Sequence, residues 1–104
     1  MHKVFEKENF LEKALLLVGK KYDLLIIDSF LQNRSKRRFN QLLDDIPGIN
    51  PRILSMRLKE LERNRLLTKN LVFGTPVRTI YHLTDKAESL EKLILELKDW
   101  AKSN

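Results

Sequence analysis

The sequence predicts an α+β fold that is mainly helical, and three observations point to it. Apolar residues recur at helical spacing over most of the chain. Between residues 66 and 83 the period changes to two, and Phe73-Gly74-Thr75-Pro76 divides this segment into two short strands. Directly before the strands lie two short helical patterns separated by Pro47-Gly48. Two helices and a hairpin in this order outline a winged helix-turn-helix, which we expect to be extended by helices at both ends.

Length and composition indicate one compact domain, 1–104, with no metal or disulfide support. The chain contains no cysteine, which excludes disulfides and thiolate metal sites. No uncharged apolar run approaches the ~20 residues that a membrane span requires. We therefore expect a soluble, cytoplasmic protein with no membrane partner. Residues 1–8 alternate charged with isolated apolar side chains and are predicted to form a tail.

A first helix is predicted from about Phe10 to Val18. Asn9 is the expected N-cap, with Glu12 three residues on as in a capping box. Gly19 offers the left-handed residue that ends many helices.

A second helical pattern begins at Tyr22 and is apolar on most sides. Its interior charges, Asp23 and Asp28, are expected to face solvent or to cap the helix. They are not expected to be catalytic.

The polar run from Gln32 to Arg38 predicts a loop or a very short strand leading into the next helix, Phe39 to Asp45. A helix N-terminus carries positive potential, so Arg37 and Arg38 together with this helix start could hold a phosphate. The alternative is a solvated loop. Asp45 and its neighbour Asp44 are expected to form a solvated helix end. The apolar stripe that should pack on the core is Phe39, Leu42, Leu43 and Ile46.

A helix from Pro51 to about Asn64 is predicted to be the recognition helix, and Asn50 and Pro51 at its start are among the residues predicted to contact DNA. Asn50 is a favoured N-cap, and proline at the first helical position loses no hydrogen bond. The residues expected to face the core are Leu54, Leu58 and Leu61, assisted by Ile53.

The opposite face of this helix carries chemistry suited to base edges in a major groove. A guanidinium can meet guanine, a hydroxyl can meet either base edge, and a thioether can meet a thymine methyl. Arg57 lies at the boundary of the two faces, where it could pair with Glu60 or Glu62 or could reach a phosphate. The residues on the outward face are Arg52, Ser55, Met56, Lys59 and Arg63.

The two strands, Leu66 to Val72 and Val77 to Leu83, are predicted to form the wing. Pro76 cannot donate to a strand ladder and belongs at the turn or a strand edge. Lys69 and Arg78 should project from the hairpin onto a sugar-phosphate backbone, and Arg78 could also enter a minor groove. Alternatively, Arg78 guards a sheet edge.

Helices at the two ends of the chain, 9–19 and 84–101, are predicted to dimerise. Thr84 should cap the second of them, whose apolar stripe is wider than a winged module of ~80 residues needs for its own core. A dimer would present two recognition helices about one helical turn of DNA apart. The alternative is a slightly larger monomeric core. The predicted dimer residues are Phe10, Ala14, Leu17, Leu93, Leu97 and Trp100.

Positive charge is concentrated in the predicted helix-turn-helix and wing. Residues 33–78 contain eleven Lys or Arg and four Asp or Glu, a net charge of +7, whereas the rest of the chain nets −1. Local cationic density of this kind is what polyanion binding requires, because neutralised phosphates release counterions. Cationic surfaces are also common on small proteins that bind no nucleic acid.

The chain resembles the HxlR-type winged-helix regulators, relatives of the MarR-like group, over about residues 11 to 101. The resemblance implies a small homodimeric transcription factor that uses its first and last helices to dimerise. The residues that carry it are Lys21-Tyr22-Asp23-Leu24-Leu25-Ile26-Ile27, Arg38-Phe39-Asn40-Gln41-Leu42, the run from Ile46 to Glu62, and Pro76 to Thr84 with Arg78, Tyr81, Leu83 and Thr84 in place.

Departures from the family pattern concern sensing and leave the predicted DNA-reading segment intact. The family commonly has an N-terminal cysteine, and its absence here excludes thiol-based sensing. Tyr22 stands where tryptophan is usual, Lys20 where a second glycine is usual, and Ala87 where glycine is frequent.

Sequence-specific binding of double-stranded DNA by a homodimeric transcriptional regulator is the leading hypothesis. A winged-helix module that binds protein or structured RNA is the alternative, since fold does not fix function. An enzyme is not expected, because the imidazoles of His2 and His82 lack a carboxylate or nucleophile at useful spacing. No cofactor is expected, since no phosphate-binding glycine loop or metal-ligand spacing occurs. No polar cluster indicates an effector pocket.

Overall fold

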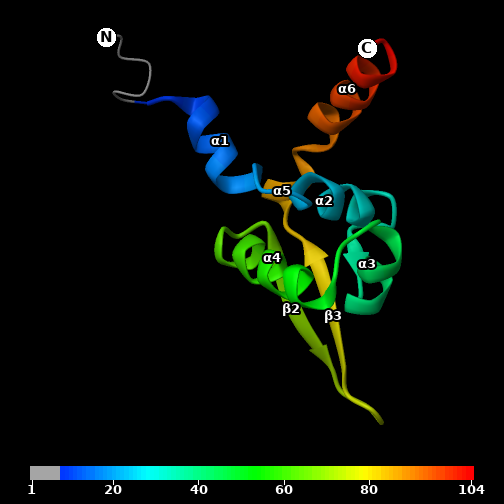
Figure 1. Ribbon diagram of the computed structural model, residues 1–104. Coiled ribbons are helices and arrows are strands. Elements are labelled where there is room, and N and C mark those ends of the chain that lie inside the picture. Colours follow the sequence, from blue (N-terminus) through cyan, green and yellow to red (C-terminus); the bar gives the residue numbers. More distant parts are fainter. Residues whose placement is uncertain (1–7) are drawn as a thin grey trace.

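The computed structural model describes residues 8–104, and in this part of the chain the fold is mainly helical with a three-stranded antiparallel sheet (Figure 1). The fold class predicted from the sequence is confirmed. The predicted tail, apart from its last residue, and His2 lie outside the described residues. The elements are α1 (Phe10–Val18), α2 (Asp23–Leu31), β1 (Lys36–Arg37), α3 (Phe39–Asp45), α4 (Pro51–Arg63), β2 (Leu67–Val72), β3 (Arg78–Leu83), α5 (Asp85–Glu88) and α6 (Glu91–Lys102).

The sheet has the strand order β1-β3-β2, so the long hairpin supplies two strands and the third is very short. The β2–β3 register runs from Leu67 opposite Leu83 to Val72 opposite Arg78. β1 pairs with the base of β3 through Lys36, which lies opposite His82. The short strand predicted before α3 is therefore present, and beyond it the β2–β3 ribbon extends without a third strand.

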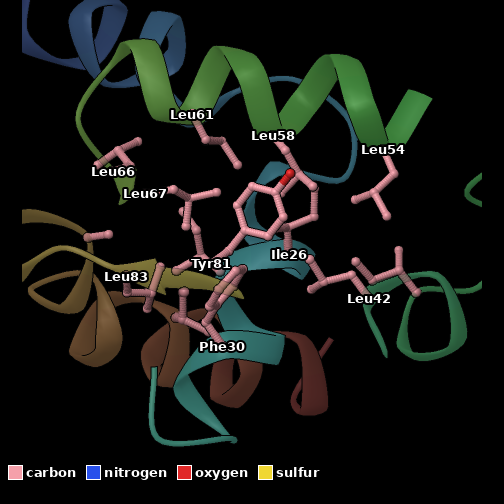
Figure 2. Close-up of a cluster of buried hydrophobic side chains, with 14 residues drawn as sticks. Ile26, Phe30, Leu42, Leu54, Leu58, Leu61, Leu66, Leu67, Tyr81 and Leu83 are labelled. Atoms are coloured by element: carbon pink, nitrogen blue, oxygen red, sulfur yellow. The ribbon is translucent and has the colours of Figure 1, made fainter. Parts of the chain in front are cut away.

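One hydrophobic core joins α2, α4 and the base of the hairpin. In α2, Ile26, Ile27 and Phe30 are fully buried. Tyr81 on β3 lies between α2 and α4 in the cluster (Figure 2). This packing fixes how α4 sits on the sheet and therefore which face of α4 remains outside.

The first helix is found where the sequence predicts it. The Asn9 Oδ1 accepts a hydrogen bond from the Glu12 backbone N–H at 2.9 Å, which satisfies a donor at the helix start. The predicted left-handed ending at Gly19 is wrong, because Gly19 has a φ of −94°. The left-handed residue is instead Tyr22, with a φ of 82°. Glycine is nevertheless required at Gly19, since a Cβ there would lie 2.3 Å from the Leu15 carbonyl oxygen.

The C-terminal helix, predicted as one piece over 84–101, is broken in two. Thr84 caps only α5, through a hydrogen bond from the Ala87 backbone N–H to its hydroxyl oxygen at 3.3 Å. The Ser89 hydroxyl then donates to the Lys86 carbonyl at 2.6 Å. A serine that bonds to a nearby carbonyl competes with the helical ladder, and the chain turns here before α6 begins. Because of this turn, α6 leaves the core near its start.

The terminal helices and the hairpin lie at opposite ends of an elongated molecule (Figure 1). Its principal extents are 59 × 32 × 25 Å. α1 contains no buried residue, and in α6 only Ile94 is buried. Across residues 8–104, no helix combines the length and the apolar character needed to cross a bilayer.

Candidate nucleic-acid interface

The start of α4 is built by local hydrogen bonds that the sequence pattern predicts. The Asn50 Oδ1 accepts from the Ile53 backbone N–H at 2.8 Å, and Pro51 occupies the first turn. The preceding turn uses Gly48 with a φ of 82°, a conformation that glycine adopts at no steric cost. The Tyr22 hydroxyl donates to the Gly48 carbonyl at 3.3 Å. α4 therefore begins from a turn held against the start of α2.

The two faces of α4 are divided as the sequence predicts. Leu54, Leu58 and Leu61 are 0 %, 2 % and 0 % exposed and point toward Tyr81 and the α2 residues (Figure 2). The opposite face is open to solvent, and its residues are Arg52, Met56, Lys59 and Arg63, with Ser55 half-buried beside them. This face brings together a guanidinium, a thioether, an ammonium and a hydroxyl along three turns of helix.

Arg57 faces inward and is held by a residue of α2. Its Nε lies 2.9 Å from the Asp23 Oδ1, and the two side chains are 12 % and 1 % exposed. Pairing of Arg57 with Glu60 or Glu62, one of the alternatives that the sequence left open, is therefore wrong, and Glu60 pairs instead with Arg63 at 3.2 Å. The expectation that Asp23 faces solvent is also wrong. The two residues are 34 positions apart, so no local pattern could have indicated their contact.

Arg37 is likewise held by residues of its own chain. Its guanidinium forms an ion pair with Asp45, which also accepts a hydrogen bond from the Ser29 hydroxyl at 2.6 Å. Asp44 and Asp45 are exposed at the end of α3, as the sequence predicts, but the sequence did not indicate the partners of Asp45. The Ser29 hydroxyl and then Arg37 hold the pKa of the Asp45 carboxyl below its ordinary value, against the opposing effect of burial. This network links α2, β1 and α3 and thereby fixes the end of α3 against α2.

A cationic groove lies between the start of α3 and the hairpin, with a cavity volume of about 460 Å³. Arg38 and Arg78, both predicted to contact DNA, come together here from distant parts of the sequence. Lys36 joins them and was not singled out by the sequence, although it belongs to the same basic run. The groove is lined by Asn33, Lys36, Arg37, Arg38, Gln41, Val72, Arg78 and Ile80.

The hairpin carries its two predicted cations outward. Lys69 on β2 and Arg78 at the start of β3 are both exposed. The end of the ribbon is exposed although its side chains are apolar. Alternation along a strand does not predict this exposure, because it does not show that the ribbon extends beyond the core. The exposed apolar residues of this wing tip are Leu71, Val72, Phe73 and Val77.

Large apolar side chains are also exposed on the two terminal helices. Of the predicted dimer residues, Phe10, Ala14, Leu93, Leu97 and Trp100 are exposed and Leu17 is half-buried. Three further leucines of α1 are exposed and were not predicted, because the apolar residues of α1 surround most of the helix and no single stripe selects them. These are Leu11, Leu15 and Leu16.

Comparisons with known proteins agree with this architecture. The model of the HxlR-like helix-turn-helix family matches residues 17–104. The transcriptional regulator YodB of Bacillus subtilis (strain 168) is 36 % identical over 91 residues, which cover 88 % of this chain and 80 % of the relative. The regulator YvaP of the same organism is 36 % identical over 90 residues, covering 86 % of this chain and 82 % of the relative.

Solved structures show the same fold. The reduced form of YodB superposes with a TM-score of 0.76 at 36 % identity and covers 88 % of both chains. A regulator described as MarR family from Porphyromonas gingivalis W83 superposes with a TM-score of 0.86 at 31 % identity, over 99 % of both chains. The chain belongs to the HxlR-like helix-turn-helix family of transcriptional regulators, whose fold is MarR-like.

Proposed function

We propose that this regulator binds double-stranded DNA in a sequence-specific manner as a homodimer. In this proposal α4 enters the major groove and the hairpin lies on the flanking backbone or minor groove. The observation that carries the proposal is the division of α4, with its three leucines in the core and Arg52, Met56 and Lys59 turned outward. A helix with that outward face can reach base edges without unfolding any part of the core.

The residues divide into base contacts and phosphate contacts. Ser55 is expected to join Arg52 and Met56 near the helix start in reading bases, since the first turns of a recognition helix meet the base edges. Asn50 and Pro51 fix the residue at which α4 begins, and therefore which of its residues enter the major groove. The cations expected to hold phosphates are Lys36, Arg38, Lys59, Lys69 and Arg78.

Arg37 and Arg57 receive a different role from the one the sequence suggests. A phosphate contact was predicted for Arg37 and was one of two alternatives for Arg57, yet both guanidinium groups pair with carboxylates of the same chain. Breaking such a pair would leave an unpaired carboxylate, and for Asp23 a buried one. We therefore propose that they position α3 and α4 and do not touch the duplex.

The homodimer is supported by the terminal helices. α1 contributes no buried residue to the core although five of its nine residues are leucine or phenylalanine. α6 lies at the same end of the molecule as α1 (Figure 1) and exposes Leu93, Leu97 and Trp100. A surface of this kind on a small protein is usually an interface. Joining two copies there leaves both hairpins and both α4 helices available to successive major grooves, ~34 Å apart.

The experiment that tests the proposal is a binding titration with duplex DNA, structured RNA and single-stranded DNA over a range of salt concentrations. We expect the duplex to bind best, because B-form geometry admits α4 and the deep, narrow major groove of RNA does not. Affinity should fall steeply with salt. Lys69→Ala should lower the salt dependence by about one counterion, whereas Lys102→Ala, outside the cationic segment, should not. Equal binding to all three ligands would contradict the proposal and favour a module for RNA or protein.

A further inference from the structure

The wing tip combines high exposure with apolar chemistry. Leu71, Val72 and Val77 are 55 %, 46 % and 53 % exposed, and Phe73 at the end of β2 is 81 % exposed. A two-stranded ribbon surrounded by water normally carries polar side chains, and a continuous apolar patch marks a contact surface. The tip also lies at the end of the molecule farthest from α1 and α6 (Figure 1). The wing tip is therefore not part of the proposed dimer interface formed by α1 and α6.

The charge of the hairpin selects the kind of partner. Residues 63–84 contain Arg63, Arg65, Lys69 and Arg78 and no Asp or Glu. A second copy of the hairpin would bring like charges together. Duplex DNA complements this pattern, because its minor groove has anionic rims and a floor of stacked bases that apolar side chains can enter. The observations therefore favour DNA over another protein as the occupant.

The hairpin also has the reach to place its tip in a groove. The last strand pair anchored by a buried side chain is Lys69 opposite Tyr81. Phe73 lies four residues beyond Lys69, and at a rise of ~3.3 Å per residue the ribbon extends about 13 Å past that pair. The minor groove is ~7.5 Å deep and ~6 Å wide. A ribbon of two strands is too broad to enter it, so only a side chain at the tip can do so.

From these observations we infer that Phe73 inserts into the minor groove as an apolar wedge that partly unstacks one base step. Lys69 and Arg78 hold the phosphates on either side, and Val77 covers the sugars next to the wedge. The inference rests on the proposed function. A wedge would favour particular base steps without any hydrogen bond to a base edge, because pyrimidine–purine steps unstack at lower cost than other steps. The bound duplex should bend away from the wedge.

The test uses the full chain and a duplex selected from a random library with the unaltered protein. The fluorescent base 2-aminopurine is placed, one position at a time, in the step beneath the wing. Phe73→Ser removes the wedge, Phe73→Leu keeps an apolar side chain, and Thr75→Ala is the matched control at the same tip. Both positions are in the exposed hairpin, so circular dichroism melting should be the same for all three variants and the unaltered chain.

With the unaltered chain, binding should raise the fluorescence of 2-aminopurine at one step. Phe73→Ser should abolish this signal and weaken binding about tenfold, the effect expected from leaving one aromatic side chain unburied. The salt dependence should not change, because no charge is lost. Phe73→Leu should retain part of the signal, and Thr75→Ala should behave as the unaltered chain does.

The wedge would be overturned if Phe73→Ser bound with unchanged affinity and the unaltered chain gave no fluorescence signal. If the unaltered chain still bound the selected duplex specifically, the proposed function would stand. Loss of self-association in Phe73→Ser, measured by sedimentation without DNA, would show that the tip contacts a second copy and would also overturn it. Failure of the library to yield any preferred duplex would overturn both the wedge and the proposed function.

Discussion

Arg57 in the middle of α4 and Asp23 at the start of α2 form a buried ion pair, with 2.9 Å between Nε and Oδ1. The second carboxylate oxygen of Asp23 accepts from the Lys20 backbone N–H at 3.0 Å. One carboxylate thus joins α4 to the segment that leads from α1 into α2. The position of the outward face of α4 depends on this contact as well as on the leucines beneath it.

Asp23→Ala should strongly destabilise the fold. Removing the carboxylate leaves the Arg57 charge buried and unpaired, and breaking a buried pair in this way costs about 3–5 kcal/mol. Urea unfolding should show the loss. Combining Asp23→Ala with Arg57→Met should recover part of the free energy of unfolding, because neither charge then remains unpaired.

Glu60→Ala is the matched control for that variant. Glu60 pairs with Arg63 on the surface of the same helix, and its loss should cost less than about 1 kcal/mol. If Asp23→Ala cost no more than Glu60→Ala, the ion pair would not be positioning α4.

The Ser29 hydroxyl should contribute stability that depends on pH. It holds the pKa of Asp45 below the ordinary value of 3.8. A lowered pKa in the folded state means that the stabilisation is present above 3.8 and is lost as the pH falls through the folded-state pKa. Ser29→Ala should therefore cost about 1 kcal/mol near neutral pH, a value reduced for the partial exposure of Asp45. Urea unfolding should show the difference from the unaltered chain shrinking toward pH ~2.5. A difference that is the same at both pH values would contradict the account.

Trp100→Glu should weaken the proposed homodimer. Trp100 is 66 % exposed, so the substitution should leave the fold of one chain intact. Burying a carboxylate at an interface should raise the dimer dissociation constant by about tenfold or more, which sedimentation velocity measures. Leu95→Glu is the control, because Leu95 lies on α6 outside the predicted stripe. An equal effect of both substitutions, or a monomeric unaltered chain, would argue against the predicted interface.

Local patterns predicted the elements of this fold well, because their causes lie within a few residues. The Asn9 and Asn50 caps bond to amides three positions on, and both helices begin where those side chains indicate. The inward leucines of α4 follow from the helical period alone. The break before α6 was missed because the Ser89 hydroxyl bond competes with a pattern of apolar residues that continues through it.

The partners of buried charges could not be predicted, since they depend on tertiary packing. Asp23 precedes an apolar run and Arg57 lies between the two faces of its helix, but no local pattern shows that the two residues meet. Only the approach of α2 to α4 removes both from water. Basic neighbours predict Arg37 as a phosphate ligand, whereas in the structure it pairs with Asp45 at the end of α3. The cationic residues that remain outside, Arg38 and Arg78, were identified correctly as exposed but not as neighbours.

Selection of bound duplexes from a random library, with the unaltered chain and with Arg52→Ala, most directly tests whether the outward face of α4 reads bases. Arg52→Ala should cost about 1–3 kcal/mol at one base pair and relax the preference there, leaving other positions unchanged. Lys69→Ala should weaken all sequences similarly. A selected sequence that stays identical in Arg52→Ala and in Ser55→Ala would contradict the assignment of α4 as the recognition helix.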